Sequence, residues 1–229
     1  MKKNNPLIVA LDVDTLEQAK VLIDELSDSV DIFKIGPHLF TAYGPLITQC
    51  VQAKGKKVFL DLKFHDIPNT VANAVKSAVS LKVFMLTVHT QGGKEMLEAA
   101  VNAAKEKAAA LGVPKPLIVG VTVLTSQPAE AKVVLERAFL AKDSGLDGVV
   151  ASVQEAEMIR KSLGKDFVIV TPGIRPSGAD AGDQKRTATP AAAIKSGSNY
   201  LVVGRPIIAD KSPRQAALKI LEEIKKGHA

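Results

Sequence analysis

The chain has 229 residues, of which 46% are hydrophobic and 24% are charged, and its formal net charge at pH 7 is +6. This composition is typical of globular proteins and excludes a disordered chain, and no apolar run approaches the roughly 20 residues that a membrane-spanning helix needs. The length suits one domain, residues 1–229, because α/β barrels often occupy about 200–250 residues. The single cysteine, Cys50, excludes an internal disulfide and favours a cytoplasmic location.

Short apolar segments recur along the chain, and each is followed by a segment of helical character. The apolar segments are residues 7–13, 32–36, 58–63, 83–89, 117–124, 148–152, 168–171 and 200–203. Strands that are buried on both faces of a parallel sheet require continuous apolar runs of this kind rather than strict alternation. The sequence therefore predicts eight parallel strands.

The first and last of the intervening segments carry clear helix signals. Thr15 and Gln18 have the spacing of a capping box, in which each side chain bonds the other residue's backbone amide. Ser212 and Pro213 suit the N-cap and the first turn of a last helix. Apolar residues follow both starts at helical spacing, at Ala19, Leu22, Ile23 and Leu26 and at Ala217, Ile220, Leu221 and Ile224.

Eight strand–helix repeats in a chain of this length predict an α/β fold of the (β/α)8, or TIM barrel, class. The alternative is an open doubly wound sheet. Such a sheet carries the motif Gly-x-Gly-x-x-Gly after its first strand when it binds a dinucleotide, and this chain has no such motif there. The barrel is therefore the favoured architecture.

In a barrel of this class the active site lies at the carboxyl ends of the strands, so polar residues there are the candidates for chemistry. They are Asp12, Lys34, Asp61, Lys63, His89, Thr125, Ser126, Gly204 and Arg205. Structural roles stay open for single residues, because Asp12 could cap a turn and Lys34 could extend its ammonium group to solvent. A lone histidine is more often a hydrogen-bonded structural residue than a metal ligand.

Residues 61–70 hold the most informative group of charged side chains. Side chains alternate along a strand, so Asp61 and Lys63 point to the same side, into the mouth of the barrel. Asp66 follows in the loop, and Pro68 disfavours helix at the residue before it. A structural ion pair is the alternative, but burying charges costs desolvation free energy and is weak evidence for stability. We therefore predict a functional role for this group.

A long polar stretch with several glycines, residues 171–184, follows the seventh predicted strand, and Gly204-Arg205-Pro206 closes the eighth. Loops after these two strands often build a phosphate site from exposed backbone amides and an arginine that binds two phosphate oxygens. A plain surface loop is the alternative. The position of Gly204-Arg205 at the eighth strand favours phosphate binding.

The chain resembles the orotidine 5'-phosphate decarboxylase family in the run Asp61-Leu62-Lys63-Phe64-His65-Asp66-Ile67-Pro68-Asn69-Thr70. Related phosphate-binding barrels share the Asp-x-Lys-x-x-Asp core, whereas Asp-Ile-Pro-Asn-Thr at 66–70 extends it specifically. The resemblance covers essentially the whole chain in order. Its other segments are Leu11-Asp12, Lys34-Ile35-Gly36, residues 121–126, residues 171–176 and Gly204-Arg205-Pro206.

The resemblance implies an enzyme that converts orotidine 5'-phosphate to UMP and CO2, the last step of UMP synthesis, with no cofactor and no metal. It implies that Lys63 donates a proton to C6 of the pyrimidine. Asp61, Lys34 and Asp66 would complete a charged array around this lysine.

The resemblance also implies the substrate contacts. Asp12 and Lys34 would contact the ribose hydroxyls, Thr125 and Ser126 the base, and Gln184, Gly204 and Arg205 the phosphate, while Arg175 matches another substrate-site position. Asp66, Ile67 and Thr70 would reach into the neighbouring subunit's site. The resemblance therefore implies a homodimer with shared active sites.

Two other functions stay open. A hexulose-phosphate synthase would use the aspartates and lysines with Mg2+ to handle an enediolate, although Pro68-Asn69-Thr70 and Thr125-Ser126 argue against it. A nucleic-acid-binding protein would explain the positive net charge, but the lysines are scattered and no basic run exceeds two residues. We expect a small anionic nucleotide as substrate, and neither nucleic acid nor a membrane as a partner.

Overall fold

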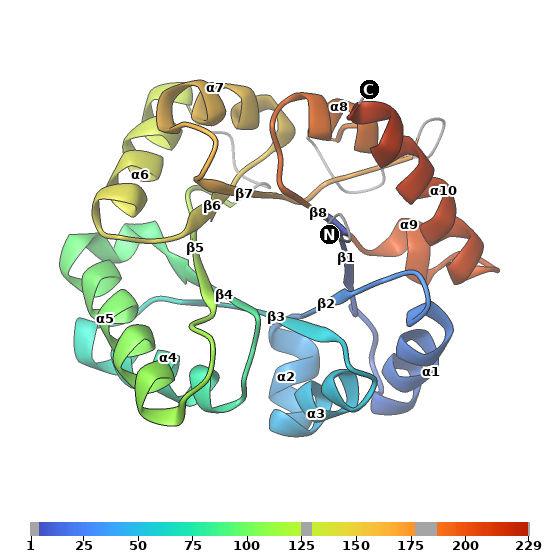
Figure 1. Ribbon diagram of the computed structural model, residues 1–229, viewed down its shortest axis with the longest axis horizontal. Helices are drawn as coiled ribbons and strands as arrows, with labels where there is room; N and C mark the ends of the chain where they lie inside the picture. The colour runs from blue at the N-terminus through green and yellow to red at the C-terminus, as the bar shows by residue number, and fades with distance from the viewer. Residues whose placement is uncertain (1–4, 125–129, 177–186, 229) are drawn as a thin grey trace.

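Eight parallel strands form a closed barrel at the centre of the protein (Figure 1). The computed structural model describes residues 5–124, 130–176 and 187–228. Each strand pairs with the next along the chain, and the last pairs with the first. The strands are β1 (Leu7–Ala10), β2 (Ile32–Ile35), β3 (Lys57–Phe64), β4 (Met85–His89), β5 (Leu117–Val121), β6 (Gly148–Val150), β7 (Val168–Thr171) and β8 (Tyr200–Val203). The predicted (β/α)8 barrel is confirmed.

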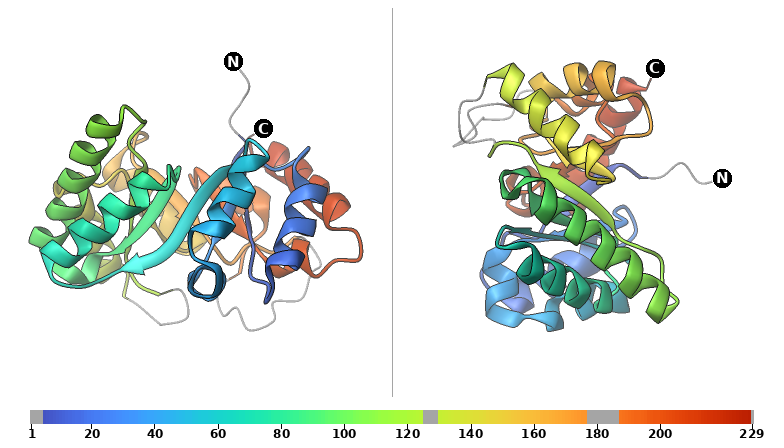
Figure 2. Two further views of the ribbon diagram at one scale, coloured as in Figure 1. Left: turned by 90° about the horizontal axis from the view of Figure 1, so that it is seen from below. Right: turned by 90° about the vertical axis from the view of Figure 1, so that its left-hand side faces the viewer.

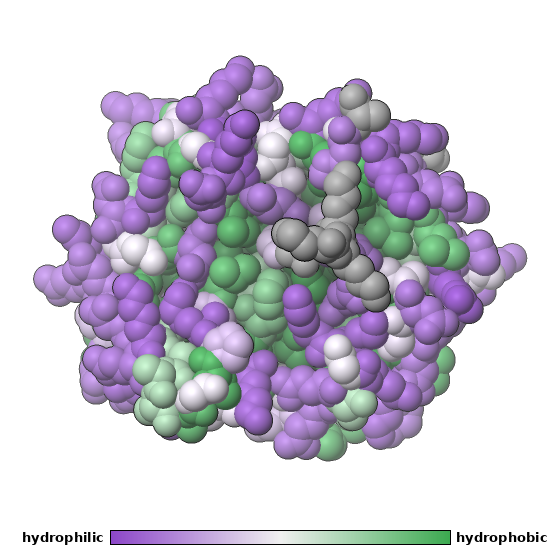
Figure 3. All heavy atoms as spheres, in the orientation of Figure 1, coloured by the Kyte–Doolittle hydropathy of each residue, from purple (hydrophilic) through white to green (hydrophobic). Residues whose placement is uncertain are grey.

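Helices surround the strands and connect each to the next (Figure 1). They are α1 (Leu16–Leu26), α2 (Pro37–Tyr43), α3 (Pro45–Ala53), α4 (Pro68–Ser80), α5 (Gly93–Leu111), α6 (Ala131–Asp143), α7 (Val153–Leu163), α8 (Pro190–Lys195), α9 (Arg205–Ile208) and α10 (Pro213–Gly227), with a 3-10 turn, η1 (Thr90–Gly92), before α5. Hydrophilic side chains cover most of the outer rim on the face shown in Figure 3. Within the described ranges, no helix is long and apolar enough to cross a membrane.

The predicted helix starts are found at both ends of the chain. In α1, the amide of Gln18 donates to Thr15 Oγ1 at 3.2 Å and the amide of Thr15 donates to Gln18 Oε1 at 3.1 Å, which completes the capping box. Helix α10 begins at Pro213, as predicted. Ser212 holds the N-cap position, but its side chain makes no capping bond; its amide instead donates to Asp210 Oδ1 at 2.8 Å.

Four strands, β1, β2, β5 and β6, end sooner than the apolar segments predict, and the difference is largest for β1 and β5. The first segment extends to residue 13 and β1 ends at Ala10, while the fifth extends to residue 124 and β5 ends at Val121. In the fifth segment, Val123 and Leu124 lie beyond the last ladder bond and line the cavity described below. Their apolar character therefore reflects the cavity wall rather than the sheet.

The apolar core has two parts, one inside the barrel and one between the barrel and its helices. On β3, Phe59 belongs to the inner part and Leu60 to the outer part, and Leu62 packs against the outer part. This alternation is the one predicted for the strand. The arrow of β3 in Figure 2 (left) runs from the upper to the lower face of that view, so the carboxyl ends of the parallel strands lie below.

Candidate active site

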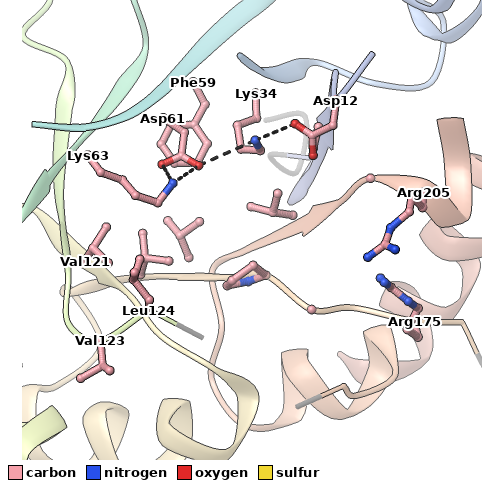
Figure 4. A pocket seen from close by; sticks show the side chains of 17 residues that line it. Asp12, Lys34, Phe59, Asp61, Lys63, Val121, Val123, Leu124, Arg175 and Arg205 are labelled. Atoms are coloured by element: carbon pink, nitrogen blue, oxygen red, sulfur yellow. Dashed lines mark hydrogen bonds and ion pairs between the residues drawn. The ribbon is translucent and has the colours of Figure 1, made fainter. Parts of the chain in front are cut away.

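A cavity of about 340 Å³ lies at the carboxyl ends of the strands (Figure 4). Its apolar wall contains Ala10, Phe59, Val121, Val123, Leu124, Val150, Val170 and Val202. The charged residues of the described lining are Asp12, Lys34, Asp61, Lys63, Arg175 and Arg205. Polar residues that the sequence predicts at separate strand ends therefore meet around one cavity.

Four of these side chains form a row in which negative and positive charges alternate, which we call the charged row: Asp12, Lys34, Asp61 and Lys63. Lys34 Nζ lies 3.1 Å from Asp12 Oδ1 and 3.7 Å from Asp61 Oδ2. Lys63 Nζ lies 2.9 Å from both carboxylate oxygens of Asp61. Only 11% of the Lys34 side chain and 14% of the Asp61 side chain are exposed, so each charge is stabilised mainly by its neighbours rather than by water.

The end of β3 departs from regular pairing. Leu60 pairs with Leu86 and Phe64 with Val88, so four residue steps on β3 match two steps on β4. Lys63 has a φ angle of +52°, in the left-handed region that residues other than glycine seldom adopt. The strand therefore bulges at the point where it carries the charged side chains, as strands often do beside active sites.

Thr87 of β4 stands opposite this bulge and is completely buried. Its hydroxyl group accepts a hydrogen bond from the Lys63 amide at 2.8 Å and donates one to Asp61 Oδ1 at 3.0 Å. One hydroxyl group therefore joins the strand backbone to the charged row.

The side chains of Arg175 and Arg205 lie at the other end of the cavity from Lys63, and their guanidinium groups point toward one another (Figure 4). Arg205 begins α9 directly after β8, and Gly204, which precedes it, also lines the cavity. Arg175 Nη1 donates to the carbonyl oxygen of Ile174 at 3.0 Å. These two arginines give this end of the cavity a positive charge that suits an anionic group such as phosphate.

Two histidines stack next to Lys63. The ring centroids of His65 and His89 are 5.3 Å apart and the rings are nearly parallel, with an angle of 22° between them. His89 Nδ1 accepts a hydrogen bond from the Gln91 amide at 3.3 Å, which makes Nδ1 the unprotonated nitrogen. Burial lowers the pKa of His89, and electrostatic interactions with His65, Arg137 and Lys63 lower it further. His89 is therefore held neutral, as a structural residue.

In the described part of the chain, no group of three or more histidine, cysteine, aspartate or glutamate side chains is arranged to hold a metal ion. In the charged row, the ammonium group of Lys34 lies between two carboxylates, at the position a cation would otherwise take. The row therefore resembles an ion-pair network more than a set of metal ligands.

Comparison with known proteins identifies the family. The family model described as "Orotidine 5'-phosphate decarboxylase / HUMPS family" matches residues 5–220. The chain belongs to this family. The resemblance found in the sequence is therefore confirmed.

Relatives in the orotidine 5'-phosphate decarboxylase family are similar over nearly their full length. The orotidine 5'-phosphate decarboxylase of Moorella thermoacetica is 51% identical, over 98% of this chain and 94% of its own. The protein of the same name from a Nostoc species is 46% identical, over 96% of this chain and 98% of its own. The solved structure of orotidine 5'-phosphate decarboxylase from Lactobacillus acidophilus matches with a TM-score of 0.85 at 38% identity, over 96% of this chain and 99% of that one.

The three residues that the resemblance would place in a neighbouring subunit's site, Asp66, Ile67 and Thr70, are exposed and do not belong to the described lining of the cavity. Ile67 is 66% exposed, and its amide donates to Asp66 Oδ1 at 2.7 Å. Helix α4 begins at Pro68, and Ile67 before it has extended geometry, as the proline predicts.

Three further residues predicted from the decarboxylase family lie outside the described residues: Thr125, Ser126 and Gln184. Sequence reasoning missed the role of Thr87 and the stack of His65 on His89. The available signal for Thr87 was its spacing, since Met85, Thr87 and His89 follow one another on the inward face of β4 at intervals of two residues.

Proposed function

We propose that this protein decarboxylates orotidine 5'-phosphate to UMP and CO2, the last step of UMP synthesis. The charged row facing an apolar cavity, with arginines at the far end, is the observation that carries the proposal. The names of the relatives at 46–51% identity support the same activity.

The chemistry of the reaction explains what the row does. Loss of CO2 from C6 of the pyrimidine leaves an electron pair in the plane of the ring, where the π system cannot delocalise it. Stabilisation must then be electrostatic, from a charge that is already in place when the pair develops. The ammonium group of Lys63, held at 2.9 Å by both oxygens of Asp61, supplies that charge. In this proposal the same group delivers the proton that completes UMP.

The other members of the row hold this lysine and the ribose. Lys34 lies between Asp12 and Asp61, so its ammonium group offsets the negative charge of the carboxylate that faces the substrate. Asp12 is 58% exposed at its side chain, which leaves its carboxylate accessible to ribose hydroxyls. Asp61 would also lie near the substrate carboxylate.

The phosphate group is assigned to the opposite end of the cavity. Arg205 and Arg175 provide guanidinium groups there, and Gly204 brings backbone close to the ligand. Binding at a position remote from C6 supplies free energy that orients the reacting carbon over Lys63. Gln184 is assigned to the same phosphate, and Thr125 and Ser126 to the base.

The active protein is a homodimer in this proposal, with Asp66, Ile67 and Thr70 of each chain completing the site of the other. Asp66 would then provide a second carboxylate beside Lys63. The exposure of all three residues in a single chain supports this arrangement.

A direct assay tests the proposal. Orotidine 5'-phosphate is added to the purified protein in EDTA, and the loss of its ultraviolet absorbance and the release of CO2 are followed. We expect turnover that EDTA does not change. No turnover with orotidine 5'-phosphate, together with a Mg2+-dependent reaction on a hexulose phosphate, would establish the alternative activity.

A further inference from the structure

We propose that Thr87 is a positioning residue for Lys63, because its single hydroxyl group holds the lysine at both ends. It bonds the Lys63 backbone directly and the Lys63 ammonium group through Asp61. This inference rests on the proposed decarboxylase function, and it concerns a residue that does not touch the substrate cavity.

The direction of both hydrogen bonds is fixed by the partners. A backbone amide can only donate, so the Thr87 oxygen must accept from Lys63 at 2.8 Å. An ionised carboxylate can only accept, so the hydroxyl hydrogen must point to Asp61 Oδ1 at 3.0 Å. The hydroxyl group therefore has one orientation that satisfies both neighbours, and its complete burial excludes competing water.

The hydrogen bond from the Lys63 amide to the Thr87 hydroxyl group stabilises the irregular end of β3. The bulge removes regular ladder pairing from the end of β3, and Lys63 takes a positive φ of 52° that a lysine does not favour. The bond to Thr87 replaces the lost ladder partner of the Lys63 amide. Without it, the strained residue loses the contact that keeps its side chain directed into the cavity.

The hydrogen bond from the Thr87 hydroxyl group to Asp61 orients the carboxylate. Asp61 binds the Lys63 ammonium group with both oxygens, and a carboxylate that turns about its own axis loses this two-point contact. The Thr87 hydroxyl fixes the rotation by donating to Oδ1. A small displacement of the Lys63 ammonium group relative to C6 lowers the rate of the chemical step more than it weakens substrate binding.

The test compares three variants. Thr87→Val keeps the shape and removes both bonds, Thr87→Ser keeps the hydroxyl group, and Thr48→Val makes the same chemical change elsewhere. Thr48 is a suitable control because it is 1% exposed and its hydroxyl group donates to the Pro45 carbonyl oxygen within α3. Each variant is assayed for kcat and KM with orotidine 5'-phosphate and for thermal unfolding.

We expect Thr87→Val to lower kcat about 10-fold to 100-fold while KM changes less than about threefold. Thr87→Ser should restore kcat to within about threefold of the unchanged protein, and Thr48→Val should leave kcat unchanged. The proposal is overturned if Thr87→Val retains full kcat, if the serine variant is as impaired as the valine variant, or if Thr48→Val is equally impaired. A Thr87→Val chain that does not fold would assign the hydroxyl group to folding instead, which also overturns it.

A second measurement does not depend on activity. Hydrogen exchange of the Lys63 amide should be slow in the unchanged protein and in Thr48→Val, and faster by about 10-fold or more in Thr87→Val. If the unchanged protein does not decarboxylate orotidine 5'-phosphate, the proposed function fails. Equal exchange of the Lys63 amide in all variants would show, separately, that Thr87 does not hold this residue.

Discussion

The ammonium nitrogen of Lys63 lies 2.9 Å from both carboxylate oxygens of Asp61, two residues before it on the same strand. Regular strand geometry places two such side chains on one face, but the bulge and the positive φ of Lys63 bring them into this two-point contact. The pair is only partly exposed, with 14% of the aspartate side chain and 35% of the lysine side chain accessible. Its two charges are therefore screened less than those of surface pairs on the helices.

Replacing Asp61 by asparagine, a neutral side chain of the same shape, tests whether the negative charge of Asp61 is needed for activity. We expect Asp61→Asn to lower kcat/KM by about 100-fold or more, because the amide cannot hold the ammonium group of Lys63 as an ionised carboxylate does. Steady-state kinetics with orotidine 5'-phosphate measure the effect. The surface variant Asp24→Asn, which breaks an exposed pair with Lys54, serves as the control and should leave kinetics unchanged. A loss of less than about tenfold in Asp61→Asn would contradict the role of the carboxylate.

We expect Arg205 to bind the phosphate group of the substrate and not its base or ribose. We expect Arg205→Ala to raise KM and to lower kcat/KM for orotidine 5'-phosphate by about 100-fold or more, while orotidine, which lacks the phosphate, is hardly affected. Arg214→Ala provides a matched control, since Arg214 is half-exposed and pairs with Asp28. Equal losses on the two substrates would show that Arg205 does not bind the phosphate.

Shared active sites predict complementation between inactive variants. Lys63→Ala and Asp66→Ala should each be inactive alone. In a mixed dimer, one of the two sites would combine the intact lysine of one chain with the intact aspartate of the other. Random exchange of subunits should therefore restore up to about a quarter of the original activity. No recovery, with subunit exchange demonstrated by mass spectrometry, would rule out a site that uses Asp66 from a second chain.

His89 should make the stability of the fold depend on pH. Its pKa in the folded protein is lowered, chiefly by burial, whereas in the unfolded chain it is about 6.5. Below this value the unfolded chain binds a proton that the native protein resists binding. His89 therefore contributes stability that is present above about pH 6.5 and is lost as the pH falls through the folded-state pKa.

Urea unfolding at about pH 7.5 and about pH 5.5 measures this contribution. The variant His89→Asn offers an oxygen in place of Nδ1 to the Gln91 amide and does not titrate, so its stability should fall less between the two pH values than that of the unchanged protein. The variant Thr48→Val, which changes a buried side chain that does not titrate, serves as the control for altered packing. An identical decrease in the free energy of unfolding between the two pH values, in His89→Asn and in the unchanged protein, would contradict the prediction.

The barrel and the members of the charged row could be predicted from the sequence for a physical reason. Strands covered on both faces need continuous apolar runs. A charged residue at the end of such a run, such as Lys34 or Asp61, is therefore best explained by a position at the mouth of the barrel. Alternation along the strand then places Asp61 and Lys63 on the same side, as the structure shows.

The contacts between strands could not be predicted in the same way. The pairing of β3 with β4 depends on where the ladder is interrupted, and neither the bulge nor the positive φ of Lys63 has a signal in local sequence. Thr87 is an ordinary strand residue until its register with Lys63 is known. The stack of His65 on His89 joins a loop to the next strand, so it too depends on tertiary geometry.

The assay of Lys63→Ala tests the central claim, that the Lys63 ammonium group completes the decarboxylation, most directly. Turnover of orotidine 5'-phosphate is measured in EDTA for this variant and for the unchanged protein, with thermal unfolding to establish that both are folded. We predict a folded variant whose kcat is lower by about 10,000-fold or more, because both the electrostatic stabilisation and the proton are lost. A folded Lys63→Ala variant that retains more than about a tenth of the original kcat would contradict the claim.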